Sequence, residues 1–395
     1  MLISHPSILF KQRPWLLSYE NFCCYLATLF PKVFFTSVLA WSLYVLLAVV
    51  SHRYIRNQYG HPILALVVSV ISISSSVLCA YTYFKVIAVG PGSPLDYEIL
   101  KIKDIQQLNK PQKQYQPANP FETAGDSSTG LLSDAEPVAP QSEPESPPTE
   151  YLQMHTMKAS AYRYCNKCSV WKPDRAHHCS SSGKCILRMD HYCPWFSTCI
   201  GFFNQKFFVQ FLFYLAVYAG FSFFLSTTIL WKILASAEYE QDFLSINLVI
   251  LFVVSLAFFF VLGGFTLFQI YMVLKNMTTI EFQEFRWDNH DKKKGSFQYE
   301  FDDRGKQKAL AHIYDLGYKK NWTSVMGNNW VEWLLPITVT SRSIEDRYNN
   351  GINFEINEDA YERWCYNAQL QDQLNQQLAD YKRRARLERE EYTAV

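Results

Sequence analysis

The chain has 395 residues and a formal net charge of +1 at pH 7, so its charge gives no reason to expect a nucleic-acid or an acidic partner. Hydrophobic residues make up 49% of the chain, and they gather in long apolar segments around a very polar linker and tail. No short apolar stretch ends in a small-residue cleavage site, so we expect no cleaved signal peptide.

The first predicted element is a short helix at the membrane surface. Residues Trp15–Phe30 are apolar, but they include Glu20 and end at Pro31. A charged segment of this length is too short to cross a bilayer. We therefore predict an interfacial helix within a cytosolic segment that covers residues 1–32.

Two transmembrane helices and a linker follow. The apolar segments 33–51 and 62–84 are long enough to cross a bilayer, and residues 52–61 would form a lumenal loop between them. Residues 90–94, Gly-Pro-Gly-Ser-Pro, stop the second helix, because neither Gly nor Pro continues a helix well. From residue 105 onward, the segment 85–157 is rich in Gln, Pro, Ser and Glu. This composition buries too little apolar area to offset its ordering entropy, so we predict a disordered cytosolic linker.

A cysteine-rich module is predicted at residues 158–206. It holds six of the ten cysteines, spaced like metal ligands, which suits a reducing compartment better than disulfides. A Cys-x2-Cys pair with a downstream His-Cys is a strong zinc signal. The candidate ligands are Cys165, Cys168, His177, His178, Cys179, Cys185, His191, Cys193 and Cys199. One tetrahedral site takes four ligands, and two sites would leave almost none for a reaction, so we expect at most one complete site.

Cys193 has the neighbours of an activated nucleophile. It follows Asp190 and His191 within three residues. The imidazole can take the thiol proton, and the carboxylate can orient the imidazole and stabilise its charge. From these residues alone, Cys193 as a further zinc ligand remains an equally open alternative.

The third and fourth transmembrane helices are predicted at residues 207–231 and 246–273, with a lumenal loop at residues 232–245. Lysines flank the four segments on one side and favour a cytosolic location for both termini and for the cysteine-rich module. They are Lys32, Lys85, Lys206 and Lys275. Arg53 and Arg56 argue the other way, so the bias is modest.

The cytosolic C-terminal region covers residues 274–395. Its aromatic patch at residues 321–336 is too short to span a membrane, and we expect it to pack on the bundle or at the interface. Residues 358–391 have helical composition, with Leu370, Leu374, Leu378 and Tyr381 at spacings of four and three. This pattern predicts an amphipathic surface helix, and a partner or membrane contact is the alternative.

The cysteine-rich module resembles the DHHC protein S-acyltransferase family over about fifty residues. The matching runs are Arg163-Tyr-Cys165, Lys172-Pro-Asp-Arg-Ala-His177-His178-Cys179, Cys185-Ile-Leu-Arg-Met-Asp190-His191-Tyr192-Cys193-Pro194-Trp195, Cys199 and Asn204-x2-Phe207. Thr278, Thr279 and Glu281 resemble the family's TTxE motif, and Asn321 with its aromatic surroundings resembles the C-terminal palmitoyltransferase motif. The sequence around residues 82–96 and 321–337 looks closest to the fungal vacuolar branch.

The resemblance implies an acyl transfer in two steps through an acyl-enzyme. Cys193 would take a fatty acyl group from acyl-CoA and pass it to a cysteine of a membrane-associated protein. His191 would be the base and Asp190 its partner. Trp195 would pack on the thioester end of the acyl chain, and Tyr218 would face the far end of a cavity between the four helices. Lys172, Arg175 and His177 would contact CoA phosphates by charge and position, with solvated surface as the alternative.

The resemblance also implies zinc, but the chain departs from the family pattern. The first zinc site is complete with Cys165, Cys168, His178 and Cys185. The second would use Cys179, Cys199 and positions 182 and 192, where this chain has Ser182 and Tyr192. Two thiols alone should bind zinc poorly, so we expect one zinc ion per chain, with Tyr192 filling the vacated space.

The sequence therefore predicts an all-α polytopic membrane protein. Four transmembrane helices would carry a cytosolic, zinc-stabilised cysteine-rich domain between helices 2 and 3. The predicted function is protein S-palmitoyltransferase, with palmitoyl-CoA, membrane-associated proteins and the bilayer as partners, and no nucleic acid. A membrane-anchored zinc-binding interaction module without catalysis is the alternative. The vacuole membrane is the expected location, with Golgi or endoplasmic reticulum as alternatives.

Overall fold

The computed structural model describes residues 14–105, 147–149, 151–153, 155, 163–235, 244–290, 299–301, 304, 307–309, 311–339 and 348–393. Most of the predicted linker at residues 85–157 lies outside the described residues from position 106 onward. Residues 236–243 of the predicted loop at 232–245 also lie outside them.

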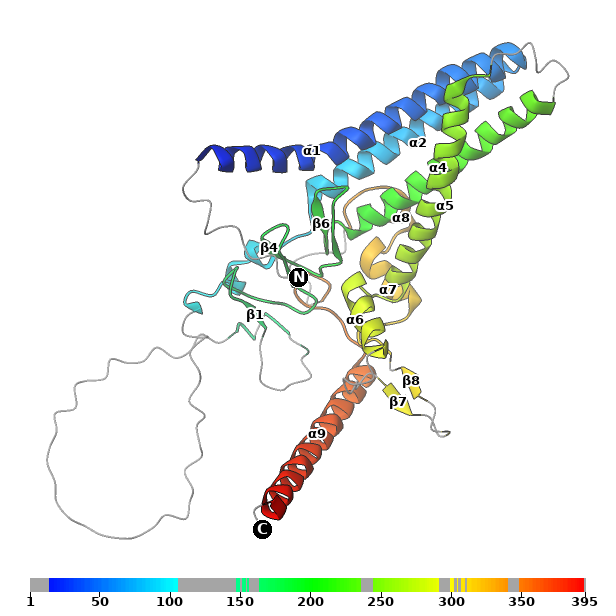
Figure 1. Cartoon of the computed structure of the whole chain (residues 1–395). Helices are drawn as coiled ribbons and strands as arrows, with labels where there is room; N and C mark the ends of the chain where they lie inside the picture. Colours follow the sequence, from blue (N-terminus) through cyan, green and yellow to red (C-terminus); the bar gives the residue numbers. More distant parts are fainter. Residues whose placement is uncertain are drawn as a thin grey trace, which may run out of the picture.

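In the described part of the chain, four helices are long and apolar enough to cross a membrane, which makes the chain a multi-pass membrane protein. The first is α1 (Pro14–Tyr44), continued by the π-helical η2 (Val45–Gln58), and the others are α2 (Pro62–Val89), α4 (Gln205–Ala235) and α5 (Ile246–Leu274). The cysteine-rich module lies between α2 and α4 in the sequence, and Figure 1 shows it at one end of the helices. The predicted fold class is confirmed.

The first helix differs from the prediction at both ends. It does not end at Pro31 but runs through this residue, and Figure 1 shows that it changes direction along its length. A proline removes one hydrogen bond and bends a long helix without ending it when packing continues on both sides. The predicted loop at residues 52–61 is also mostly helical, because η2 reaches Gln58 and buries Tyr54 and Ile55.

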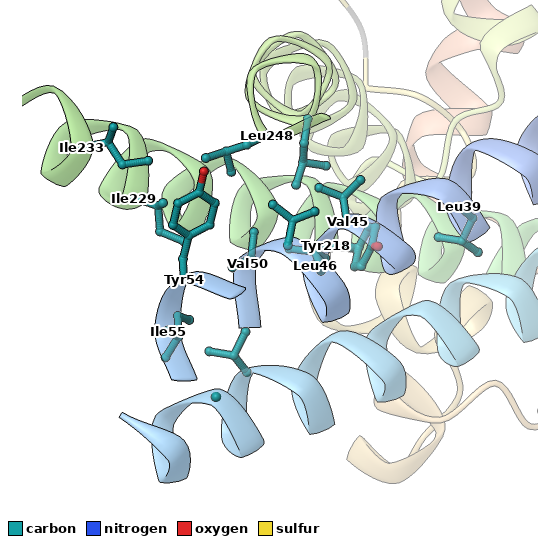
Figure 2. Close-up of a cluster of buried hydrophobic side chains, with 14 of the residues drawn as sticks. Leu39, Val45, Leu46, Val50, Tyr54, Ile55, Tyr218, Ile229, Ile233 and Leu248 are labelled. Carbon is teal, nitrogen blue, oxygen red and sulfur yellow. The ribbon is translucent and has the colours of Figure 1, made fainter. Parts of the chain in front are cut away.

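Apolar side chains join the four helices near the end that lies far from the cysteine-rich module. Figure 2 shows Leu46, Val50 and Tyr54 of η2 close to side chains of α4 and α5, such as Ile229 and Leu248. The π-helical segment carries the largest share of this cluster. Many other apolar side chains of the helices are exposed, as expected of surfaces that face lipid.

The cysteine-rich module is built from three short antiparallel hairpins. They are β1 (Tyr164–Cys165) with β2 (Val170–Trp171), β3 (His177–Cys179) with β4 (Lys184–Ile186), and β5 (His191–Cys193) with β6 (Thr198–Ile200). Two 3-10 turns, η3 (Pro94–Asp96) and η4 (Glu98–Leu100), lead from α2 toward them. A module with so little regular structure and so few apolar residues requires another source of stability.

The C-terminal region packs against the same end of the bundle. It contains α6 (Thr279–His290), the hairpin β7 (Tyr299–Phe301) with β8 (Gln307–Ala309), α7 (Tyr318–Met326), α8 (Trp330–Leu334) and α9 (Glu358–Thr393). Val325 and Met326 of α7 pack on Val273 of α5, so the aromatic patch lies on the bundle. Figure 1 shows α9 extending away from the membrane helices.

Candidate active site and metal centre

The hairpin β5–β6 places the predicted base and nucleophile together. His191 and Cys193 are two residues apart on a strand, so their side chains leave the same face. Tyr192 between them points to the other face, where it is paired with Cys199 across the hairpin. The alternation of the strand thus separates a reactive face from the face that a second metal site would occupy.

Asp190 is buried and held on two sides. Its Oδ2 lies 2.6 Å from Nδ1 of His191, and its Oδ1 accepts a 2.7 Å hydrogen bond from the backbone N–H of Thr279. The hydroxyl of Thr279 also donates to the carbonyl oxygen of Asp190. The carboxylate therefore cannot turn away from the imidazole, and Nε2 of His191 is left for the side of Cys193.

The surroundings of His191 favour its protonated form. Burial lowers the pKa of the imidazole, but hydrogen bonds with Asp190 and Cys193 outweigh burial and raise the pKa to about 9. At neutral pH the ring therefore holds a proton beside Cys193. A histidine next to a cysteine is the pair of groups that enzymes use for nucleophilic catalysis by a thiol.

A cavity of about 560 Å³ begins at Cys193 and runs between the membrane helices. Nearly all of its lining is apolar, with side chains from α1, α4 and α5. On α4 the lining reaches from Phe208 to Ser222, fourteen residues apart, which is about 21 Å along an α-helix. This length and this apolar lining suit an extended fatty acyl chain.

Trp195 and Tyr218 line this cavity together with Cys193. The Trp195 ring packs near Phe34 of α1, at a centroid distance of 6.1 Å, beside Cys193. The Tyr218 hydroxyl lies 2.8 Å from the Ser42 hydroxyl, deep in the bundle. The structure thus brings the two predicted acyl contacts onto one cavity, at different depths from the thiol.

Four side chains of the first hairpins form a candidate metal centre. Cys165, Cys168, His178 and Cys185 bring their ligand atoms within 4.8 Å of one another. The three sulfur atoms lie 3.6, 3.3 and 3.8 Å from Nδ1 of His178. Zinc with Zn–S of about 2.3 Å and Zn–N of about 2.0 Å in a tetrahedron places sulfur and nitrogen about 3.5 Å apart. The residues therefore fit zinc without rearrangement.

The second set does not form such a group. Among the residues that the structure describes, the four above are the only metal-competent cluster of three or more His, Cys, Asp or Glu side chains. The Ser182 hydroxyl lies 3.6 Å from Sγ of Cys199, and the Ser182 N–H donates to Sγ of Cys179. Tyr192 packs against the buried cluster that contains both thiols. At the position expected for a second ion, the side chains pack against one another and form weak hydrogen bonds.

Arg175 is not placed as the sequence suggested. We expected it to contact CoA phosphates, but its guanidinium is buried and bonded to Glu281 and Asn276. His177 is only half-buried, yet burial and the nearby Arg163 lower its pKa to about 4, so it carries no charge for a phosphate at neutral pH. Lys172 is also half-buried, and its contact with CoA stays a prediction.

The remaining motif residues hold backbone segments in place. The Glu281 carboxylate accepts a 2.8 Å hydrogen bond from the backbone N–H of Thr278. Burial raises the pKa of this carboxyl, but the lowering effects, chiefly the positive charge of Arg175, together outweigh burial and the pKa falls to about 2. The Asn321 side chain is fully buried; it donates to the carbonyl of Leu274 at 2.8 Å and so terminates α5. These residues support the site without lining the cavity.

Sequence reasoning missed three residues around the site. Ser42 bonds Tyr218, the Tyr83 hydroxyl donates to the Trp195 carbonyl at 2.7 Å, and the Phe208 ring packs against His191 with centroids 5.4 Å apart. All three lie on inner faces of transmembrane helices, where apolar residues on every side hide the periodicity. The one available signal is that hydroxyls in such helices usually face a neighbouring helix.

Comparisons with known proteins agree with this arrangement. The family model described as DHHC palmitoyltransferase matches residues 158–286. The chain is 56% identical to the palmitoyltransferase PFA3 of Debaryomyces hansenii over 99% of this chain and 98% of that protein. The palmitoyltransferase PFA3 of Candida albicans is 48% identical over 95% and 96%, and that of Saccharomyces cerevisiae is 34% identical over 88% and 91%.

Proposed function

The chain belongs to the DHHC palmitoyltransferase family and is a protein S-acyltransferase, and we propose that Cys193 is the residue that carries the acyl group. The observation that supports this most strongly is the position of Cys193 between His191 and the mouth of the apolar cavity. An interaction module would need neither a base beside a thiol nor a cavity that ends at it.

In the first step the Cys193 thiolate attacks the thioester carbonyl of acyl-CoA. A bond forms between Sγ and the carbonyl carbon, the bond to the CoA sulfur breaks, and the CoA thiolate takes the proton held on His191. In the second step the base accepts the proton of the acceptor cysteine. That thiolate attacks the acyl carbonyl, and Cys193 leaves as a thiolate. Asp190 keeps the ring oriented throughout, as the carboxylate of a catalytic triad does.

The cavity supports a long acyl chain such as palmitoyl as the transferred group. Its lining is almost entirely apolar, so burial of each methylene stabilises the complex by about 0.8 kcal/mol. The hydrogen-bonded pair Tyr218 and Ser42 lines the part of this cavity that lies farther from the thiol, where it would contact the distal part of a long acyl chain. For the CoA part of the substrate we retain Lys172 as a phosphate contact.

We propose one zinc ion per chain, held by Cys165, Cys168, His178 and Cys185. A bound zinc would join three chain segments of a module that has little core of its own, and it would stabilise the fold rather than take part in the reaction. The pair Cys179 and Cys199, with Ser182 and Tyr192, offers too few ligands for a second ion.

For location we propose the vacuole membrane, with both termini and the cysteine-rich module in the cytosol. Support comes from the resemblance to the fungal vacuolar branch and from the lysines at one side of the helices. Acyl-CoA and reduced thiols are then on the same side as Cys193, and membrane-associated proteins are the acceptors.

The experiment is acyl labelling of the purified full chain with an alkyne-tagged palmitoyl-CoA. We expect one hydroxylamine-sensitive label, its loss in Cys193→Ser, and its retention in Cys199→Ser, which removes a matched buried thiol of the same hairpin. Undiminished labelling of a folded Cys193→Ser protein would assign the acyl group to another residue and sink the proposal.

A further inference from the structure

Arg175 is a buried cation that the reaction described above does not use. Only 4% of its surface is exposed. Its backbone has a φ of 63°, in the left-handed region that residues other than glycine seldom adopt. The N–H of Met189 donates to its carbonyl at 3.0 Å, one residue before Asp190. The fold maintains a strained backbone here, and the result is that the side chain points inward.

The guanidinium binds the segment made of the α5–α6 connection and the first turn of α6, here called the 276–281 turn. Its Nε and Nη2 lie 2.7 and 2.8 Å from the two carboxylate oxygens of Glu281. Nη2 and Nη1 donate to the carbonyl and the side-chain oxygen of Asn276 at 2.7 and 3.0 Å. A bidentate ion pair with two further hydrogen bonds fixes both ends of a six-residue turn.

Aromatic rings from the C-terminal region cover the same guanidinium. It lies 4.3 Å from the ring centroid of Tyr314 and 5.3 Å from that of Phe354. Arginine stacks on aromatic faces in a way that lysine does not. Arg175 thus connects the cysteine-rich module, the end of α5 and the C-terminal region at one point.

The turn that Arg175 grips is the turn that holds Asp190. Thr279 lies inside it and donates its N–H to Oδ1 of Asp190, whose Oδ2 faces His191. A shift of the turn would therefore displace the carboxylate and, with it, the imidazole beside Cys193. In active sites a displacement of about 1 Å costs on the order of a hundredfold in rate.

We propose that Arg175 is a positioning residue for acyl transfer: it locks the 276–281 turn so that Thr279 holds the Asp190 carboxylate where it orients His191. This inference rests on the proposed roles of Cys193, His191 and Asp190. It replaces the expected CoA contact, and it differs from a role in fold stability alone because the effect of Arg175 passes through Asp190.

The test is a double-mutant cycle on single-turnover acyl loading from palmitoyl-CoA. Arg175→Lys keeps the charge but loses the bidentate pair and the stacking. In the otherwise native chain we expect a rate roughly 10–100-fold lower with KM for palmitoyl-CoA changed by less than about threefold. When Arg175→Lys is added to Asp190→Asn, we expect the loading rate to change by less than about twofold, because the carboxylate through which Arg175 acts is already lost.

Arg163→Lys is the matched control. Arg163 donates a hydrogen bond to the carbonyl of Ala176 in the same module and makes none to residues 276–281 among the described residues. The loading rate of this variant should therefore stay near that of the native chain. Equal zinc content and a single size-exclusion peak report that each variant is folded. Phe354→Leu is a milder change, because it removes an aromatic ring beside the guanidinium and keeps Arg175 itself. It should lower the loading rate less than Arg175→Lys does, and it should not lower the rate further in the Asp190→Asn background.

Three outcomes would overturn the inference. Equal losses in both backgrounds would assign Arg175 a role independent of Asp190. A raised KM for palmitoyl-CoA with an unchanged loading rate would assign Arg175 a role in CoA binding. Loss of the folded state in both Arg175→Lys and Phe354→Leu would make it a residue of fold stability only. Failure of the proposed function itself is distinguishable, because Asp190→Asn would then load at the native rate.

Discussion

At the scale of single residues, the site depends on the two neighbours of the His191 ring, each of which lies beside a different ring nitrogen. Asp190 takes Nδ1, and Cys193 faces the other side of the ring. The motif Asp190-His191 with Cys193 made these positions predictable, because the residue types and a strand's alternation are enough to place the side chains. The role of Arg175 was not predictable, because a basic residue in a polar run looks the same whether its side chain points outward or inward.

The first prediction at this scale concerns pH. The folded-state pKa of His191 is about 9, above its ordinary value of 6.5. Its contribution to stability is therefore fully present below about pH 6.5 and is lost as pH rises through 9. We expect the difference in Tm between the native chain and His191→Gln to shrink steadily from pH 6.5 to 9 in detergent. A difference that stays constant over this range would mean that the ring is not protonated in the fold.

At the scale of elements, three short hairpins position the functional side chains of the cysteine-rich module. Each of the three hairpins positions a metal ligand or a reactive group, and the first two supply all four ligands of the metal centre. The ligand spacing was readable from the sequence. The continuous first helix was not predictable, because a proline can bend a helix without ending it, and the basic residues before Gln58 are compatible with a helix as well as with a loop.

The element-scale prediction concerns the metal. Purified protein should contain about one zinc ion per chain. The Cys165→Ser variant should lose both its zinc and its folded state, because a structural zinc contributes roughly 10–16 kcal/mol of binding free energy coupled to folding. Cys199→Ser, a buried thiol outside the four ligands, should cost only about 0.5–3 kcal/mol and keep the zinc. Elemental analysis with two zinc ions per chain, or an equal collapse of both variants, would contradict the assignment of ligands.

At the scale of the whole molecule, the proposed nucleophile Cys193 lies where the membrane helices meet the cysteine-rich module. Cys193 belongs to one buried cluster with Tyr83 and Val86 of α2 and Phe207 and Phe208 of α4. An acyl chain can therefore stay in the apolar cavity while its thioester is at the membrane surface. This geometry favours acceptor proteins that are already held at the same membrane.

The prediction at this scale concerns orientation. A glycosylation acceptor inserted into the short connection Tyr59–His61 should be modified, and the same acceptor placed after Thr393 should not. Two native sequences, Asn276-Met-Thr278 and Asn321-Trp-Thr323, also match the glycosylation pattern. They cannot report orientation, because both asparagine side chains are buried and hydrogen-bonded. A glycan at the C-terminal acceptor, with none at residues 59–61, would reverse the proposed topology.

The central claim is that one acyl group passes through Cys193 on its way to the acceptor. It is tested most directly by loading the enzyme with labelled palmitoyl-CoA, removing all free acyl-CoA, and then adding a cysteine-containing acceptor peptide in vesicles. The account predicts that the label leaves the enzyme and appears on the peptide in equal amount, and that a Cys193→Ser enzyme has no label to give. If the loaded enzyme kept its label while the peptide was acylated only when fresh palmitoyl-CoA was supplied, the acyl-enzyme would be a side product and the account would be wrong.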